Sequence, residues 1–209
     1  PTDSHLLAIA QSGIDALNQR HGIERFHLFH RRRQWNPEEN KWMGWERKRG
    51  KLEEFNRLLR GAPDTSFVVR TAGDELLKTI RYVITLDSDT QLPRDVARKL
   101  IGAAVHPLNQ PVIDESTNRV TSGYGIVQPR VSIALASASR SKLVQIFSGY
   151  TGIDPYTTAV SDVYQDFFGE GSFTGKGLYD VDAFQRTLEN RVPPNALLSH
   201  DLFESLFAR

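Results

Sequence analysis

The chain has 209 residues, of which 39% are hydrophobic, and its acidic and basic residues nearly cancel to a formal net charge of +1. That length can bury a substantial core, and the apolar content argues against disorder, while the charge balance gives no reason to expect a nucleic-acid partner. The absence of cysteine excludes a disulfide framework and a cysteine zinc site. No apolar run is long enough to span a bilayer and no signal peptide is evident, so we expect this piece to be soluble. Because the sequence starts at Pro1 without Met and stops at Arg209 just past an apolar run, we expect a fragment of a longer protein.

The first seventy residues are expected to alternate between helices and strands. Apolar periodicity predicts helices over residues 4–20 and 50–59, and short apolar runs predict strands over residues 25–31 and 66–70. Residues 32–45 are polar apart from tryptophans and are expected to form a loop. The expected core positions of the two helices are Leu6, Leu7, Ala10, Ile14 and Leu17, and Leu52, Phe55, Leu58 and Leu59.

The clearest strand is expected over residues 82–86 (YVITL), an unbroken β-branched and aromatic run. Such a run is typical of a strand buried on both faces of a parallel sheet. Pro93 suits the first turn of a following helix, because that position lacks a partner for its amide in any case. The core face of this helix would consist of Val96, Leu100, Ile101 and Ala104.

Weaker signals follow in the second half of the chain. Two short strands are expected within residues 112–128, on either side of a turn at residues 114–118. Residues 148–176 are rich in glycine, aromatic and acidic residues with weak periodicity, which is typical of a functional loop. Further helices are expected over residues 137–147, 180–188 and 200–208. Strands alternating with helices predict an α/β fold.

Two carboxylates stand directly after the predicted buried strand, in the sequence Asp87-Ser88-Asp89. Ligands of open α/β sheets bind beyond the carboxyl ends of strands, where this pair would lie. Neighbouring carboxylates repel each other unless they share a cation, and Mg²⁺ or Mn²⁺ prefers carboxylate and phosphate oxygens and can bridge a diphosphate. In the alternative interpretation, Asp87 and Asp89 are turn residues that cap the next helix.

A basic helix start is predicted where Lys48, Arg49 and Lys51 surround Gly50. The first amides of a helix and its partial positive charge favour an anion, and basic side chains add to that field, so the segment suits a diphosphate. The alternative is a solvated basic helix start without a ligand.

Two features in the last forty residues also carry chemistry. Residues 169–177 (GEGSFTGKG) contain glycines that permit close approach to a ligand, but Gly177 after Lys176 departs from the spacing of a nucleotide P-loop. Aromatic residues beside this segment suit either a sugar platform or ordinary loop anchors. Asp201 opens the last predicted helix, where it can deprotonate an acceptor hydroxyl or simply stabilise the helix dipole.

Three long stretches resemble the cyclic β-1,2-glucan synthases, within the broader group of processive inverting glycosyltransferases that includes cellulose synthase. They are residues 35–59 (WNPEENKWMGWERKRGKLEEFNRLL), 82–95 (YVITLDSDTQLPRD) and 168–184 (FGEGSFTGKGLYDVDAF). The resemblance implies a GT-A (Rossmann-like) fold, a mixed sheet flanked by helices, incomplete at both ends of this chain. It also implies UDP-glucose as donor, a growing β-1,2-glucan as acceptor, Mg²⁺ or Mn²⁺ as cofactor, and a large multi-span synthase of the bacterial inner membrane with this portion at the cytoplasmic face.

The resemblance assigns roles to particular residues. Residues 1–130 would form the nucleotide-sugar-binding half, and residues 131–209 the acceptor-binding half with the catalytic base, Asp201. Asp89 would hold the metal, and Asp87 would share the metal or contact the donor. The remaining roles are donor binding by Lys48, Arg49 and Lys51, and acceptor binding by Gly169, Glu170, Gly171, Ser172, Phe173 and Thr174.

The chain departs from the pattern of this group in three places. The acidic pair that carries the base is here His200-Asp201, and neither the first nucleotide-binding strand nor the Gln-x-x-Arg-Trp motif is present. Two other functions remain open from the sequence. A haloacid-dehalogenase-type phosphatase also begins with Asp-x-Asp but has Thr or Val where this chain has Gln91, and a carbohydrate-binding domain could keep the fold without activity.

Overall fold

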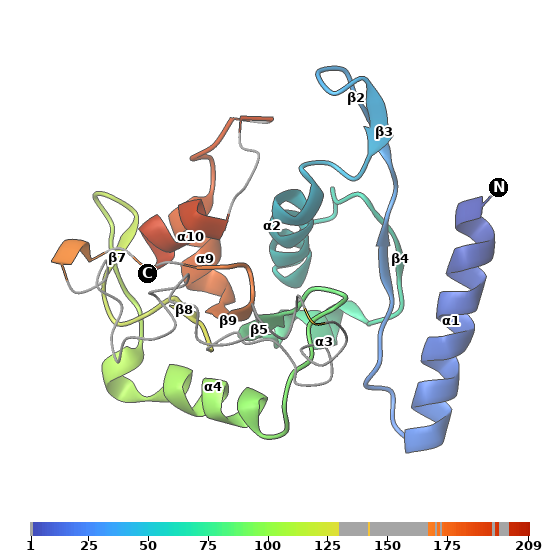
Figure 1. Cartoon of the computed structure of the whole chain (residues 1–209), viewed down its shortest axis with the longest axis horizontal. Helices are drawn as coiled ribbons and strands as arrows, with labels where there is room; N and C mark the ends of the chain where they lie inside the picture. Colours follow the sequence, from blue (N-terminus) through green and yellow to red (C-terminus); the bar gives the residue numbers. More distant parts are fainter. Residues whose placement is uncertain are drawn as a thin grey trace. The chain divides into compact units, whose positions relative to one another are not determined.

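A computed structural model describes residues 2–129, 142, 167–169, 171, 173–193, 195–196 and 201–209 of the chain (Figure 1). These residues form two compact units, Pro1–Ile80 and Arg81–Arg209. The predicted helix over residues 137–147 and most of the predicted loop over residues 148–176 lie outside the described residues. Among the helices that are described, none is both long and apolar enough to cross a membrane. The proposed functional halves, residues 1–130 and 131–209, stay a prediction.

The first unit contains three helices and two small antiparallel sheets. Strand β1 pairs with β4, and β2 forms a hairpin with β3. The elements in chain order are α1 (Thr2–His21), β1 (Phe29–Arg31), β2 (Gln34–Asn36), β3 (Lys41–Met43), α2 (Arg47–Leu59), β4 (Phe67–Arg70) and α3 (Asp74–Lys78).

Helix α2 packs its apolar face against the β1–β4 sheet. Phe55 of α2 lies edge-on to Phe29 and at a similar steep angle to Phe67, with ring centroids 5.1 and 6.1 Å away. Leu58 and Leu59 are buried, as their helical spacing predicts. Aromatic edge contacts of this kind add to the free energy of burying the rings, so this cluster is the apolar core of the unit.

Two sequence predictions in the first unit need correction. The strand predicted over residues 25–31 is shorter in the structure, where β1 begins at Phe29. The predicted polar loop over residues 32–45 contains the hairpin of β2 and β3. Asn36 makes that hairpin possible, because its side-chain oxygen accepts from the amides of Glu38 and Glu39 in the turn. The strands are too short for a period of two to be visible in the sequence.

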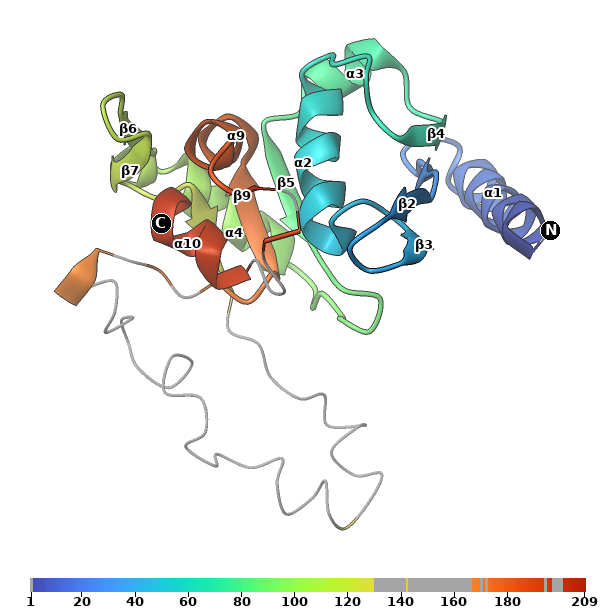
Figure 2. The ribbon, with the colours of Figure 1, turned by 90° about the horizontal axis from the view of Figure 1, so that it is seen from above.

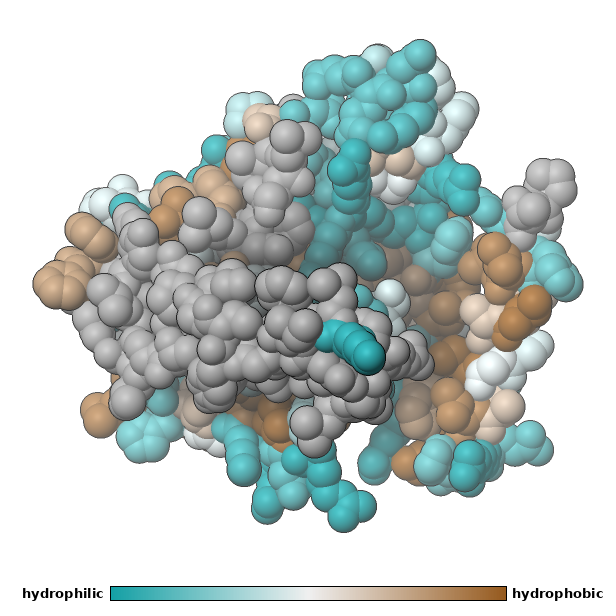
Figure 3. Space-filling model, in the orientation of Figure 1, coloured by the Kyte–Doolittle hydropathy of each residue, from teal (hydrophilic) through white to brown (hydrophobic). Residues whose placement is uncertain are grey.

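Helix α1 forms where periodicity predicts it, but its apolar side chains are poorly covered. Leu6 and Leu17 were expected in the core and are 61% and 38% exposed, and Ile9 is also exposed. Apolar surface is visible over α1 in the space-filling view (Figure 3). The spacing of the apolar residues therefore predicted the helix correctly, but not the burial of these positions.

The second unit is built on a three-stranded sheet with the order β5-β9-β8, in which both pairs are antiparallel (Figure 2). A separate β6–β7 hairpin stands where two strands around a turn were predicted, and α4, α9 and α10 match three predicted helices. The bounds are β5 (Tyr82–Thr85), α4 (Val96–Val105), η1 (Pro107–Asn109), β6 (Val112–Asp114), β7 (Arg119–Ser122), β8 (Ile126–Val127), β9 (Gly177–Asp180), α9 (Val181–Leu188) and α10 (Asp201–Ala208).

The expectation of a parallel sheet around residues 82–86 is wrong for the described strands. β5 runs antiparallel to β9 at one edge of the sheet, and its first three residues are only half-buried. The buried centre is β9, where Leu178 and Tyr179 are almost fully shielded from solvent. The architecture is nevertheless mixed α/β, as the alternation of elements predicted.

Helix α4 covers this sheet with Leu100 and Ala104, which pack around Leu178. Ile101 was expected on the same face but is 43% exposed. Pro93 was expected in the first turn, yet the helix begins at Val96, after Asp95 in a left-handed conformation.

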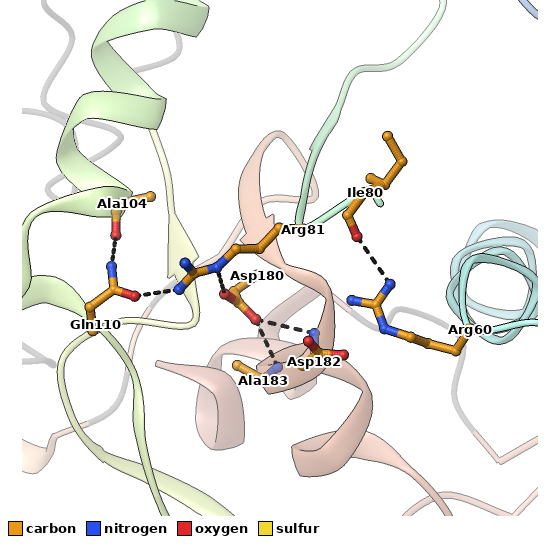
Figure 4. Close-up of polar contacts among 8 residues, drawn as sticks. All are labelled: Arg60, Ile80, Arg81, Ala104, Gln110, Asp180, Asp182 and Ala183. Atoms are coloured by element: carbon orange, nitrogen blue, oxygen red, sulfur yellow. Dashed lines mark hydrogen bonds and ion pairs between the residues drawn. The ribbon is translucent and has the colours of Figure 1, made fainter. Parts of the chain in front are cut away.

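A buried carboxylate ties the sheet to two helices (Figure 4). Asp180, 6% exposed at the end of β9, accepts from the amides of Asp182 and Ala183 at 3.1 Å each and so caps α9. Its other oxygen lies 3.2 Å from Nε of Arg81, and the same guanidinium donates to Gln110. Gln110 in turn donates to the carbonyl of Ala104 in α4. The start of β5, the end of β9, α9 and α4 are therefore joined through one acid.

Asp180→Ala should lower the free energy of unfolding by about 2 kcal/mol or more, because it removes an N-cap and leaves Arg81 without its carboxylate. Asp180→Asn keeps a capping oxygen and should cost about half as much. Urea unfolding followed by far-ultraviolet circular dichroism measures both. Equal losses for the two variants would show that the charge, and not the cap, carries the effect.

Candidate functional site

The antiparallel register places the end of β5 beside the start of β9, with Thr85 opposite Gly177. The hydroxyl of Thr85 is buried and donates to the carbonyl oxygens of Gly175 at 3.1 Å and Gly177 at 3.4 Å. The residues that follow β5 and the residues that precede β9 therefore share one edge of the sheet. Two motifs that the sequence singled out, Asp87-Ser88-Asp89 and residues 169–177, meet at this edge.

Asp87 and Lys176 form an ion pair at the edge. Oδ2 of Asp87 lies 2.8 Å from Nζ of Lys176, and the two side chains are 35% and 26% exposed. Asp87 also starts a turn, since its carbonyl accepts from the amide of Thr90. Asp89 is exposed. A divalent cation is therefore not the only charge that can offset the repulsion between these carboxylates, because Lys176 already places a positive charge against Asp87.

The turn that carries Lys176 is tightly built. Gly175 has a φ of +72°, in the left-handed region that favours glycine. A Cβ on Gly177 would lie 2.8 Å from the carbonyl oxygen of Val127 in the neighbouring strand. Thr174 donates from both its amide and its hydroxyl to the side-chain oxygen of Gln128, at 2.6 and 3.0 Å.

The predicted acceptor segment has mixed environments. Phe173 is 5% exposed and belongs to the core, so it anchors the segment. Gly169 is one of the residues that the structure describes. Gly171 lies against α10, where its amide donates to the carbonyl oxygen of Ser205 at 3.4 Å. Glu170 and Ser172 lie outside the described residues.

The candidate base is placed only by its backbone. Asp201 is the first residue of α10, and His200 and the Asp201 side chain lie outside what the structure describes. The helix itself is well anchored, since Ser205 and Ala208 are buried and the amide of Gly125 donates to Ala208. Because Gly171 contacts the same helix, the acceptor segment and the helix that begins at Asp201 are neighbours.

The basic residues of the predicted diphosphate site lie in α2, in the first unit. Arg49 is 13% exposed and pairs with Glu46 at 3.0 Å and Glu53 at 3.3 Å, with its guanidinium over the Trp45 ring. Lys48 is half-buried and Lys51 is exposed. Arg49 therefore already has a structural role in holding the helix start, whatever else it contacts.

The helix start adopts a strained backbone that the sequence did not reveal. Glu46 and Arg47 have φ of 49° and 51°, a conformation that costs free energy in residues other than glycine. The buried guanidinium of Arg31 holds this turn by donating to the carbonyls of Trp45 at 3.1 Å and Arg47 at 2.8 Å, and to Glu54 at 2.9 Å. Strained turns persist where surrounding contacts over-determine them and cluster at functional sites.

Gly50 lies within the first turns of α2, and its role is close packing. A Cβ there would lie 2.2 Å from the carbonyl oxygen of Trp45 and 2.7 Å from Cβ of Glu46. The glycine between the basic residues is therefore required by the strained turn at the start of α2.

Gly50→Ala should lower the free energy of unfolding of the first unit by about 2 kcal/mol, because the backbone must move to relieve the overlap. Gly13→Ala is the matched control in α1, where an added Cβ meets nothing within 4 Å; it should stabilise by about 0.5–1 kcal/mol. All three tryptophans precede Gly50, so denaturant unfolding followed by tryptophan fluorescence reports on this unit. Similar stabilities for the two variants would contradict the packing role.

The acidic side chains at the edge do not form a complete metal cage. Among the side chains described, no three His, Cys, Asp or Glu residues gather closely enough to hold an ion. Mg²⁺ is usually held by one or two carboxylates together with water and substrate phosphates. Asp87 and Asp89 therefore fit an ion that arrives with a diphosphate better than a resident structural metal.

Comparison with known proteins finds sequence similarity to an enzyme. No protein-family model matches the sequence. The curated protein named cyclic beta-(1,2)-glucan synthase NdvB, from Rhizobium meliloti (strain 1021), is 51% identical over 213 aligned residues. The alignment covers 100% of this chain but 8% of that protein. Over its whole length, the chain is thus similar to a short portion of a cyclic β-(1,2)-glucan synthase.

Proposed function

We propose that the chain is part of the glycosyltransferase domain of a cyclic β-1,2-glucan synthase, with a GT-A fold, and that it transfers glucose from UDP-glucose to a growing β-1,2-glucan. The observation that carries this proposal is the 51% identity to NdvB, in an alignment that covers 100% of this chain. The meeting of the Asp87-Ser88-Asp89 turn with residues 174–177 at one sheet edge supports it, since a transferase needs donor and acceptor groups side by side.

The donor would be held at the end of β5. Asp89 is exposed and Asp87 partly so, and both would bind Mg²⁺ or Mn²⁺ together with the diphosphate oxygens of UDP. When bound, the ion offsets the charge that develops on the departing nucleotide. The resemblance also assigns Lys48, Arg49 and Lys51 of α2 to donor binding, and this assignment stays a prediction.

Within that basic set, the residues differ in what they can contribute. Arg49 already serves Glu46 and Glu53, but a guanidinium has five N–H donors, so it can contact an anion as well. Lys51 is exposed, whereas Lys48 is half-buried. Lys51 is therefore the most accessible of the three to an anion that arrives from solvent.

The acceptor would lie along residues 169–174. Phe167 and Phe168, 79% and 68% exposed, precede the segment and offer apolar faces to a sugar ring. Asp201 would accept the proton of an acceptor 2-hydroxyl, which attacks C1 of glucose from the face opposite UDP. The α-linked donor would then give a β-linked product. The parent synthase would be a large membrane-embedded protein with this portion at the cytoplasmic face of a bacterial inner membrane.

Calorimetric titration of the chain tests the donor class. UDP and UDP-glucose should bind in the presence of Mn²⁺ about tenfold more tightly than GDP or ADP, and should weaken about tenfold without the metal. Asp89→Asn should weaken metal-dependent UDP binding to a similar extent, whereas the exposed Asp15→Asn in α1 should leave it unchanged.

Two other results would replace the proposal. Binding of glucan that ignores both UDP and divalent metal would favour a carbohydrate-binding domain. Hydrolysis of simple phosphoesters without nucleotide preference would favour the phosphatase.

Asp201→Asn in the full-length synthase should lower glucose transfer by about 10²–10⁴-fold, because an amide cannot accept the hydroxyl proton. UDP binding should stay at the wild-type value, since the base does not contact the nucleotide. Asp182→Asn, another acid in the first turn of a helix, is the control. Incorporation of labelled glucose into glucan measures the effect, and near-normal transfer by Asp201→Asn would remove it from the mechanism.

A further inference from the structure

Lys176 has no role in the donor or acceptor sets that the resemblance assigns, yet its ammonium group lies at the centre of the site. Nζ is 2.8 Å from Oδ2 of Asp87, the first acid of the Asp-x-Asp turn. The lysine belongs to the turn between the acceptor segment and β9, and Asp87 follows β5. Their contact links the two motifs directly through side chains.

The position of Lys176 is fixed by its neighbours in the turn. Gly175 takes up the left-handed conformation, and the close approach of Gly177 to Val127 leaves no room for a side chain there. Thr85 binds the carbonyl oxygens on both sides of the lysine, at Gly175 and Gly177. The backbone on either side of Lys176 is therefore anchored to β5. This anchoring places the Lys176 side chain at the end of the strand, beside Asp87.

Stability alone is a poor explanation for this arrangement. An ion pair whose side chains are 26% and 35% exposed contributes little to the free energy of folding, because solvent screens it. Replacing either glycine would conflict with the turn, through φ at Gly175 and through the 2.8 Å contact at Gly177. The turn thus favours a fixed ammonium group in a half-open position, which suits binding of an anion that arrives from solvent.

We propose that Lys176 is a further donor-binding residue, whose ammonium group contacts the diphosphate of the sugar nucleotide beside the metal-binding acids. A carboxylate offers about four acceptor sites, so Asp87 can serve Lys176 and a cation together. Lysine acts on phosphate as a point charge and needs no planar partner, which fits a single ammonium at the strand end. This inference rests on the proposed function, because it presumes a nucleotide diphosphate at the site.

The test is titration of the full chain with UDP and with UMP, each with and without Mn²⁺. Lys176→Met should weaken UDP binding about tenfold or more in both conditions, and should weaken UMP binding less, because UMP lacks the second phosphate. Lys176→Arg should keep most of the affinity for UDP. Lys78→Met is the control for removal of a paired lysine, since Lys78 lies 3.1 Å from Glu75 in α3, in a more exposed ion pair than that of Lys176 with Asp87.

The outcomes separate this inference from the function on which it rests. If the wild-type chain binds UDP with Mn²⁺ and Lys176→Met binds it equally well, Lys176 is a counter-ion of Asp87 only and the inference fails while the function stands. Tighter Mn²⁺ binding by Lys176→Met with unchanged UDP affinity would also show that Lys176 only neutralises Asp87, and would contradict the inference. If the wild-type chain binds no uridine nucleotide, both proposals fail. Lys176→Gln, with urea unfolding as a check, replaces Lys176→Met if that variant does not fold.

Discussion

The antiparallel pairing of β5 with β9 is the constraint on which the candidate site depends. Two strands that run in opposite directions bring the end of one beside the start of the other, and the register sets Thr85 against Gly177. The other end of the pair is held by Asp180, which caps α9 and meets Arg81. With both ends fixed, Asp87 and Lys176 face each other although they are far apart in the sequence.

The charges at this edge of the sheet determine which kind of ligand the site can bind. Among the described residues, this edge carries the ammonium group of Lys176 and the carboxylates of Asp87 and Asp89, of which Asp89 is exposed. Two acids with one lysine beside them form a weak site for a bare divalent ion, since the lysine already offsets part of their charge. A metal–diphosphate complex brings both a cation for the acids and an anion for the lysine. The proposed ligand is therefore a nucleotide and a metal ion that bind together.

The sequence predicted the helices better than the sheet. Periodicity located α2, α4 and α9, because one apolar face of each packs on a core. It did not reveal β9, since Gly177-Leu178-Tyr179-Asp180 is short, begins with glycine and adjoins a loop-like segment. Nor could it show that β5 pairs antiparallel, because strand direction depends on long-range contacts. The acids at 87 and 89 were recognisable by their place after an apolar run. The ion pair with Lys176 and the clamp of Arg31 on the start of α2 were not, since they join residues distant in sequence.

Paramagnetic broadening of backbone amide signals by Mn²⁺ in the presence of UDP tests the central claim most directly, because the effect depends on distance from the ion. The account predicts that the amides of residues 86–90 and 174–177 broaden together and that UDP strengthens the effect at low Mn²⁺. Broadening that spares either of these two segments, or that UDP leaves unchanged, would contradict a shared metal and nucleotide site at the β5–β9 edge.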